Sequence, residues 1–377
     1  MFVTALADRE AVLLAPYAMA SAASTGRRYS EPEHPYRAPF QRDRDRIVHS
    51  AAYRRLSYKT QVFTGEMGDY HRTRLTHTLE VASVARTLAR ALRLNEDLVE
   101  ALALLHDIGH PPFGHAGEEM LGDCLAAHGG FDHNRQALRI VEELEQRYPD
   151  FPGLNLSREV LDGQAFRARQ GADRESPLLE VQVVDAADSV AYDTHDADDA
   201  LQLGLLQFDE LRDLPLWREA VARVNRRWAQ LESGQLRRSV ILELINWQVS
   251  DLLAGASQRL GGRAIDSIAA VKRSDILIHP SDELAEQKAE FEQFLFARVY
   301  RHPQVLAVRR HAQDQLRAMF DQYTAQPDLL PPGFRGLCRR AGVARAVADY
   351  LAGMSDRYAQ QQFQRFCARS PVTSNPE

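Results

Sequence analysis

The segment Leu98 to Leu105 constrains the fold of this chain more than any other, because every position except Glu100 is apolar. A helix that is apolar on all sides lies inside a protein, where other elements cover it. Asn95 precedes the segment as an N-cap, and two acidic residues follow it in the first turn, where the helix dipole favours negative charge. The glycine and the proline pair of His106 to Pro112 end the pattern. The sequence thus predicts a buried helix with a His-Asp pair at its C-terminal end.

Apolar residues at helical spacing continue on both sides of this segment, and the pattern stays helical to the end of the chain. No run of strands alternates with helices, so we predict an all-α fold. The further predicted helices cover residues 75–92, 116–128, 134–147 and 177–203. Loops are predicted at the polar stretch 148–176, the glycine-rich stretch 255–262 and the proline-rich stretch 324–336.

Composition excludes several classes of protein. The chain has 377 residues, 45% of them hydrophobic, which is enough for one large or two modest domains. A net charge of −6 argues against a broadly basic nucleic-acid binder. Three scattered cysteines suit a reducing cytoplasm rather than a disulfide framework. No apolar stretch approaches the roughly 20 residues of a membrane span, and segment 12–23 lacks the basic start of a secretory signal. We expect a cytoplasmic enzyme or regulator without a membrane partner.

Histidines are concentrated in one part of the chain, where seven of the 13 lie between residues 71 and 133. His106 and Asp107 follow the predicted buried helix, and a buried carboxylate beside an imidazole needs compensation, which a divalent metal commonly supplies. The plainer interpretation is that Asp107 caps the turn and His106 makes one ordinary hydrogen bond. The same dipeptide recurs at His195 and Asp196, so the dipeptide alone does not establish a metal site.

Two further positions favour a metal. His77 lies on an apolar stripe of the preceding helix, and Asp188 interrupts an apolar stripe of the following long helix. Together with His106 and Asp107 they supply two imidazoles and two carboxylates. This set suits Mn, Fe, Ni or Zn and leaves coordination positions open for water and substrate. Asp185, one turn before Asp188, is the competing candidate for the fourth ligand.

Several longer stretches of sequence together form a recognisable pattern. These stretches are Gln41–Ser50, Tyr53–Leu56, Lys59–Val62, Arg72–Val81, His106–His110, Pro112–His115, Gly129–Asn134 and Ala187–Tyr192. Jointly they are specific, although no single one is. Through them the chain resembles the HD-domain phosphohydrolases, and specifically the bacterial deoxyguanosine triphosphate triphosphohydrolase-like family.

The resemblance implies an activity and an organisation. It implies metal-dependent hydrolysis of a deoxynucleoside triphosphate (dGTP or another dNTP) to the deoxynucleoside and inorganic triphosphate, with Mn, Mg, Fe, Ni or Zn as the metal. A dNTP as allosteric activator and a homo-oligomer are further expectations. The fold expected from it is an HD-domain helical bundle with a C-terminal helical extension. Its expected parts are an N-terminal arm at 1–45 that contributes to the nucleotide pocket and oligomer contacts, a catalytic core at 46–210 and a C-terminal helical region at 211–377.

The resemblance also implies roles for individual residues. His77, His106, Asp107 and Asp188 match the family's metal ligands. His115 matches its catalytic histidine, and Glu118, three residues on, is placed to orient that imidazole and to stabilise its charge. Tyr192 against the sugar would also clash with a 2′-hydroxyl and so select for deoxyribose. The matches to substrate-binding residues are Arg74, His110 and His133 at the phosphates, Arg55 and Gln61 in the nucleotide pocket, and Tyr192 and Asp196 at the deoxyribose.

Three departures from the family's pattern limit the transfer. Ser189 stands where some relatives carry a phosphate-binding lysine, so the cation there has to come from elsewhere. The segment 164–176 matches no family text. His71 receives no site role, because Tyr70-His71 inverts the order usual before the Arg-Thr-Arg run.

Two other functions are kept as alternatives. The first is another HD phosphohydrolase, either a 5′-nucleotidase or a cyclic-nucleotide phosphodiesterase, and the match outside the metal ligands argues against both. The second is a non-catalytic regulator that binds nucleotides or single-stranded nucleic acid, which would be expected to lack a ligand. Single-stranded nucleic acid is kept only as a weak candidate partner, on the basic stretch of Arg42, Arg44, Arg46, Arg54 and Arg55.

Overall fold

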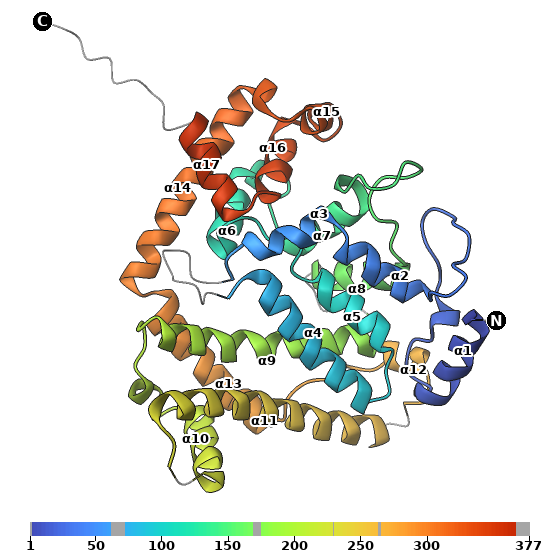
Figure 1. Cartoon of the computed structure of the whole chain (residues 1–377), viewed down its shortest axis with the longest axis vertical. Helices are drawn as coiled ribbons and strands as arrows, with labels where there is room; N and C mark the ends of the chain where they lie inside the picture. Colours follow the sequence, from blue (N-terminus) through green and yellow to red (C-terminus); the bar gives the residue numbers. More distant parts are fainter. Residues whose placement is uncertain (1, 62–71, 169–174, 229, 263–264, 367–377) are drawn as a thin grey trace, which may run out of the picture.

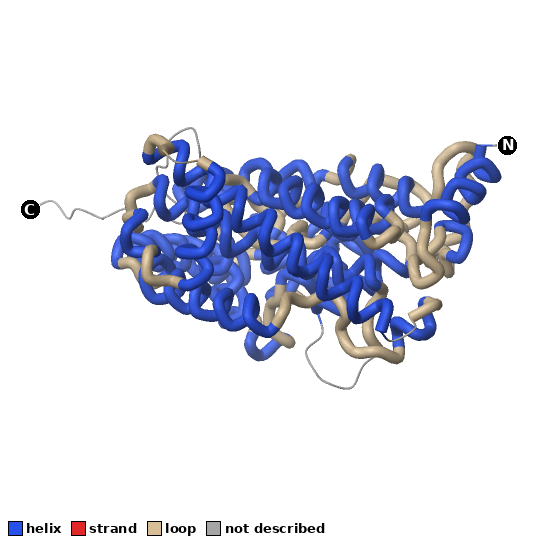
Figure 2. The backbone as a smooth tube through the Cα atoms, turned by 90° about the horizontal axis from the view of Figure 1, so that it is seen from below, coloured by secondary structure: helices blue, strands red, loops and turns tan. Residues whose placement is uncertain are grey.

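The computed structural model describes residues 2–61, 72–168, 175–228, 230–262 and 265–366. Within these ranges the chain consists of helices joined by loops, and β-structure is limited to isolated bridges (Figures 1 and 2). The predicted all-α fold is therefore confirmed. In chain order the first helices are α1 (Phe2–Leu13), α2 (Pro39–Val48), α3 (Ala51–Arg55), α4 (Arg74–Ala91), α5 (Glu96–Leu105), α6 (Gly114–Cys124), α7 (His133–Arg139), α8 (Arg158–Ala168) and α9 (Leu179–Gln202).

The later helices extend this arrangement at both ends. Figure 1 shows α14 to α17 gathered around α6 at the top of the view, and α10 and α11 at the bottom. Helices α4 and α9 lie between these two groups. The later helices are α10 (Pro215–Arg227), α11 (Ser233–Gly262), α12 (Ile268–Lys272), α13 (Asp282–Leu295), α14 (Pro303–Ala325), α15 (Pro332–Ala341), α16 (Val343–Ala352) and α17 (Asp356–Phe366).

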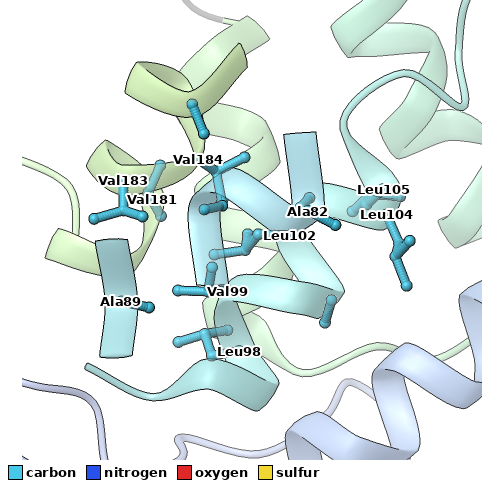
Figure 3. Packing of buried hydrophobic residues seen from close by; sticks show 14 of the residues in the cluster. Ala82, Ala89, Leu98, Val99, Leu102, Leu104, Leu105, Val181, Val183 and Val184 are labelled. Carbon is cyan, nitrogen blue, oxygen red and sulfur yellow. The ribbon is translucent and has the colours of Figure 1, made fainter. Parts of the chain in front are cut away.

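Helix α5 is the buried helix that the sequence predicts. The Asn95 side chain accepts a hydrogen bond of 3.2 Å from the Leu98 N–H, so the predicted N-cap is confirmed. Leu98 and Leu105 are fully buried, and Figure 3 shows this run packed between side chains of α4 and α9. Each such leucine contributes about 1.5–3 kcal/mol through burial. The helix that ends at the His-Asp pair is thereby held rigidly in the core.

The loop predicted at 148–176 is wrong in part, because α8 occupies Arg158–Ala168. This helix packs through a glycine: a Cβ on Gly163 would meet Leu102 Cδ2 at 2.6 Å and Val181 Cγ2 at 2.9 Å. A contact made through a missing side chain leaves no apolar stripe in the sequence. The pattern of hydrophobic residues therefore could not reveal α8.

The loop predicted at 255–262 is also wrong, because these residues form the end of α11. Leu252, Ala256 and Leu260 are buried at helical spacing. Packing of this face outweighs the cost of about 1 kcal/mol for each glycine in a helix. In the described part of the chain, α11 included, no helix has both the length and the apolar character that a membrane crossing requires.

Helix α7 is shorter than the predicted helix 134–147. It ends at Arg139 and continues only as a π-turn, Ile140–Leu144. In the proline-rich stretch, α14 ends at Ala325 and α15 begins at Pro332. The connection predicted there is thus present.

Hydrophobic cores cross the predicted boundaries between regions. One core joins α4, α5 and α9 to Leu252, Ala256 and Ile278. A second joins the end of α9 to α10, α11 and α13. A third joins α6, which carries His115, to α14, α16 and α17. The C-terminal helices thus share cores with helices that carry histidines of the site, while the boundaries at 45 and 210 stay a prediction.

Candidate functional site

His77, His106 and Asp188 bring their ligand atoms together although each belongs to a different part of the fold. Thr73 caps α4 by accepting a hydrogen bond from a backbone N–H, which sets the start of the helix that carries His77. His106 follows the last turn of α5, and Asp188 lies in the middle of α9. Nε2 of His77 lies 3.1 Å from Oδ1 of Asp188, and Nε2 of His106 lies 3.7 Å from the same oxygen. All three ligand atoms lie within 4.8 Å of one another, as a metal site requires.

The state of His106 fits a metal ligand. Its Nδ1 lies 2.6 Å from the carbonyl oxygen of Ala103, which can only accept, so Nδ1 carries the proton. Its Nε2 therefore presents a lone pair, and this buried atom has no hydrogen-bond partner. Burial lowers the pKa of His106 despite the nearby carboxylates, which keeps the ring neutral. A neutral imidazole whose second nitrogen is fixed by a carbonyl is the usual form of a metal-binding histidine, so these residues fit a divalent metal.

Asp107 lies beside this group but is engaged by other residues. Its Oδ2 accepts a hydrogen bond of 2.9 Å from Nη1 of Arg74. Its Oδ1 lies 3.1 Å from Nε2 of His110 and 3.7 Å from Nε2 of His106. Burial opposes its ionisation, but the charge of Arg74 and the hydrogen bond with His110 outweigh burial and hold the pKa of Asp107 well below the usual range. Asp107 is thus an anion between two histidine groups, and its ligation of a metal stays a prediction.

Asp188 and its competitor Asp185 are distinguished by their surroundings. Burial opposes the ionisation of Asp188, but His106, the hydrogen bond with His77 and the charge of Arg167 outweigh it and lower the pKa of Asp188. Asp185 instead lies 3.3 Å from Nη1 of Arg167 and is not part of the compact group. The geometry therefore favours Asp188 as the ligand from α9.

His110, Glu118 and His133 form a second group, which is called the second group below. The rings of His110 and His133 stack with their centroids 3.8 Å apart. Oε1 of Glu118 accepts a hydrogen bond of 2.8 Å from the backbone N–H of His133. The same oxygen lies 2.8 Å from Nδ1 of the His133 ring. Gly109 permits this approach, because a Cβ there would meet the carbonyl oxygen of His133 at 1.9 Å. The stacking therefore depends on a glycine inside the His-Asp motif.

Electrostatics separate the members of this second group. Burial and the positive charge of Arg74 hold the pKa of His110 well below its usual value, so its ring is neutral. Burial opposes the ionisation of Glu118, but the hydrogen bonds from His133 outweigh it and lower the pKa of Glu118 to about 2. Glu118 belongs to α6, and its carboxylate is a fixed anion beside the N-terminus of α7, where the helix dipole also favours negative charge.

The expected pairing of Glu118 with His115 is not what the structure shows, because Glu118 hydrogen-bonds His133. His115 lies in the first turn of α6, and its ring centroid is 5.9 Å from that of His110. The side chain of His115 is exposed to the cavity, yet protein atoms crowd it; this crowding and Arg74 lower its pKa, while Glu118 acts in the opposite direction. The spacing in sequence could not show that Glu118 pairs with His133. The backbone N–H of His133, at the start of α7, has no acceptor within its own helix and therefore donates to the Glu118 carboxylate.

One cavity of about 480 Å³ contains residues of both groups. It is lined by His77 and Asp188 of the metal group, by His110 and His133, and by His115. Three predicted substrate-binding residues, Gln61, Arg74 and Tyr192, also line it. The structure therefore brings into one cavity most of the residues that the sequence singled out.

The chain is similar to known proteins over nearly its whole length. A protein of Brucella anthropi is 45% identical over 95% of this chain and 96% of its own length. A protein of Bordetella pertussis is 45% identical over 93% and 96%, and one of Leptospira interrogans is 40% identical over 95% and 97%. All three are named deoxyguanosinetriphosphate triphosphohydrolase-like proteins. The chain belongs to this family.

Two family models match the chain and agree with the position of the site. The HD domain matches residues 74–193, a range that begins at Arg74 and includes His77, His106 and Asp188. The phosphohydrolase-associated domain matches residues 278–365. The member of the triphosphohydrolase-like family described here is therefore an HD-domain phosphohydrolase, and most residues that line its cavity lie within the matched HD domain.

Two predicted substrate-binding residues lie outside the cavity. Arg55, at the end of α3, is exposed and lines a different cavity, together with Lys59 and Gly353. Asp196 is buried two turns along α9 from Asp188, and its Oδ2 accepts a hydrogen bond from the hydroxyl of Tyr300. Neither residue lines the cavity that contains the two histidine groups, and their contact with a nucleotide stays a prediction. The motif that contains Arg55 did not show which direction its side chain takes at the end of α3. The motif that contains Asp196 did not show that Tyr300, in the π-turn Phe296–Tyr300, contacts α9.

The C-terminal region supplies contacts that the sequence did not suggest. Asp356, the first residue of α17, accepts hydrogen bonds of 2.9 Å from the N–H groups of Thr60 and Phe113. Lys59 is buried and donates to the carbonyl oxygens of His110 at 2.5 Å and Ala352 at 2.8 Å. Burial lowers the pKa of Lys59 to about 7, although Asp356 opposes this. Nothing near Asp356 in sequence marks it, because its partners lie far away along the chain.

The basic stretch that suggested nucleic-acid binding is largely paired within the protein. Arg46 is buried and forms an ion pair with Glu31 at 2.6 Å. Arg42 lies 3.3 Å from the same carboxylate, and Arg44 lies 3.2 Å from Asp45. These charges are partly neutralised, which weakens the case for a nucleic-acid surface at this stretch. His71 lies outside the described residues.

Proposed function

We propose that this chain hydrolyses a deoxynucleoside triphosphate to the deoxynucleoside and inorganic triphosphate, with a divalent metal held by His77, His106, Asp107 and Asp188. One observation carries the proposal: a single cavity joins a potential metal group to stacked histidines and to a solvent-facing histidine. The names of the relatives support the choice of substrate, and the cavity is of the size expected for a small-molecule ligand.

The metal and the fixed cations would act on the phosphates. When bound, Mn, Mg, Fe, Ni or Zn supplies positive charge to a phosphoryl oxygen and makes water a better nucleophile. Arg74 adds a permanent charge beside the metal ligands, and its buried Nε has no hydrogen-bond partner in the protein. His110 and His133 stack along the same cavity and can present ring nitrogens to phosphate oxygens. Preorganised donors of this kind stabilise charge that develops in the transition state.

His115 would donate the proton to the departing 5′-oxygen. It is exposed to the cavity and lies close to the stacked pair, so it can reach a substrate seated there. Crowding and Arg74 lower its pKa in the free protein, which disfavours the protonated form. A bound triphosphate carries about four negative charges and would raise that pKa again, because a nearby opposite charge favours the cationic imidazole. Glu118 acts in the same direction from one helical turn away and holds His133 in place.

Tyr192 would provide the selection for deoxyribose. Its ring is half-buried at the edge of the cavity, on the same helix as Asp188. A 2′-hydroxyl placed against this ring would clash, whereas a 2′-hydrogen would not. Gln61 lines the same cavity as a candidate pocket residue. Arg55 and Asp196 keep the expected substrate roles only if substrate binding moves the segments that carry them.

The proposal is tested by product analysis. Each dNTP and rNTP is supplied alone and in mixtures with Mn²⁺ or Mg²⁺, and inorganic triphosphate and nucleoside are measured. We expect equal amounts of triphosphate and deoxynucleoside from at least one dNTP and none from rNTPs. Release of orthophosphate from deoxynucleoside monophosphates, or opening of a cyclic nucleotide, would instead establish one of the other HD phosphohydrolase activities. A complete lack of turnover with bound nucleotide would support the regulator.

The same assay addresses activation and assembly. Activity that appears only in mixtures would identify a dNTP activator, as the family resemblance implies. Light scattering of the 42.5 kDa chain, with and without dNTPs, measures whether it forms the expected homo-oligomer. A cytoplasmic location is part of the same proposal and is checked by fractionation of cells.

A further inference from the structure

Arg167 lies in the cavity although no motif contains it. It is the residue before the end of α8, and its guanidinium lines the same cavity as His77 and Asp188. Nη2 of Arg167 lies 2.6 Å from Oδ2 of Asp188, and Nη1 lies 3.3 Å from Oδ1 of Asp185. One guanidinium thus faces both carboxylates that compete for the metal. Nη2 donates a hydrogen bond to Asp188, whereas Nη1 makes an ion pair with Asp185 without a hydrogen bond. The fixed fork of a planar guanidinium lets one side chain face both carboxylates, which a lysine cannot do.

Because of this contact, the two carboxylate oxygens of Asp188 have different partners. Oδ2 is taken by Arg167, while Oδ1 faces Nε2 of His77 at 3.1 Å and Nε2 of His106 at 3.7 Å. Asp185 lies one helical turn earlier on α9, so its carboxylate is close to the same centre. Without the guanidinium, two neighbouring anions would repel each other and either could turn toward a cation.

We propose that Arg167 is a positioning residue of the metal centre, which turns Oδ1 of Asp188 toward His77 and His106 and holds Asp185 away from them. The inference rests on the metal site of the proposed function, and it deepens that site by naming what selects its carboxylate ligand. Partners that orient metal ligands in this way typically change metal affinity or activity 10–100-fold when they are removed.

The direction of the effect separates this role from simple electrostatics. Arg167 carries a positive charge next to a cation site, so removal of its charge alone would strengthen metal binding. Loss of orientation would weaken it. A weaker affinity in Arg167→Gln therefore reports positioning, and a stronger affinity reports charge.

The experiment is a calorimetric titration of the full chain with Mn²⁺ in the absence of nucleotide. We expect Arg167→Gln to bind Mn²⁺ about 10–100-fold more weakly. Arg167→Lys should recover only part of this loss, because an ammonium can still contact one carboxylate but lacks the fork that faces both. Asp185→Asn should leave the affinity unchanged. The double variant Arg167→Gln, Asp185→Asn should bind more tightly than Arg167→Gln, because the competing carboxylate is gone.

Arg158→Gln is the matched control, since Arg158 is exposed at the start of the same helix, and it should bind Mn²⁺ like the unmodified chain. Thermal unfolding of every variant without metal shows whether the fold is kept. Equal or tighter Mn²⁺ binding in a folded Arg167→Gln would overturn the proposal, as would weaker binding in Asp185→Asn. A double variant no better than Arg167→Gln would overturn the exclusion of Asp185. These titrations contain no nucleotide, so they stay interpretable even if no dNTP is hydrolysed.

Discussion

The two histidine groups of the site differ in how their carboxylates are engaged. The metal group contains a buried Nε2 of His106 without a partner, facing a carboxylate that is strongly acidic. In the second group, Glu118 already binds both the ring and the backbone of His133. Asp107 lies between them, 3.7 Å from His106 and 3.1 Å from His110. Each group thus keeps one buried ring nitrogen without a hydrogen-bond partner, Nε2 of His106 in the first and Nδ1 of His110 in the second. The groups differ in that Glu118 is also fixed by a backbone N–H, whereas Oδ1 of Asp188 faces two imidazole nitrogens.

The largest expected effect comes from a change at His106, which tests whether the first group binds the metal. His106→Gln removes the unpartnered nitrogen, so it should abolish measurable Mn²⁺ binding and reduce kcat by about 10³-fold or more, since the metal supplies several kcal/mol. His133→Ala is the contrasting variant and should bind Mn²⁺ normally. Calorimetry and triphosphate release measure both. Normal metal binding in a folded His106→Gln would refute the assignment of the metal group.

His115 belongs to neither group and should separate chemistry from metal binding. His115→Ala should keep Mn²⁺ affinity and lose about 10²–10⁴-fold in kcat, the usual contribution of a general acid. Metal content and turnover are measured on the same preparation. Turnover like that of the unmodified chain, at equal metal content, would remove His115 from the mechanism.

Asp356 contacts the loop that leads into the helix of His115, through the N–H of Phe113, and within the described part of the chain it forms no hydrogen bond or ion pair with the metal group. Phe113 has a positive φ of 63° and precedes the helix of His115, so this backbone is held in a strained conformation. Asp356→Asn should weaken two hydrogen bonds to a charged acceptor. We expect a loss of about 1–2 kcal/mol in the free energy of unfolding and a lower kcat at unchanged KM.

Chemical denaturation and steady-state kinetics measure this change, and Mn²⁺ affinity should stay the same. Asp314→Asn, at an exposed position of α14, is the matched control. A change in Mn²⁺ affinity without a change in kcat would show that Asp356 acts on the other group.

The smallest effect concerns the pH dependence of stability. The pKa of Glu118 is about 2 in the folded chain, against a usual value of 4.5, because His133 hydrogen-bonds the carboxylate. A carboxylate with a lowered pKa contributes stability that is complete above 4.5 and is lost as the pH falls toward 2. Compared with Glu118→Gln, the unmodified chain should therefore lose its advantage in urea unfolding below pH 4.5. An advantage that is constant across this range would show that Glu118 is not held as an anion.

Much of this fold follows from local patterns. The N-cap at Asn95, the buried run to Leu105 and the long helix around Asp188 could be predicted because each produces a regular spacing of apolar or capping residues. Helix α8 could not be predicted, since Gly163 makes its contact with Leu102 by having no side chain. The glycines of α11 were misleading for the opposite reason, because burial of Leu252 and its neighbours outweighs their weak helix propensity.

The candidate site divides in the same way. The sequence alone predicted which residues would hold a metal, because motif and spacing single out His77, His106, Asp107 and Asp188. Only the tertiary structure decided how they are paired. Glu118 binds His133 rather than His115, Asp185 binds Arg167, and Asp356 reaches the loop before His115 from far along the chain. The reason is physical: spacing along a helix fixes which face a residue occupies, whereas partners in space depend on how helices distant in sequence pack together.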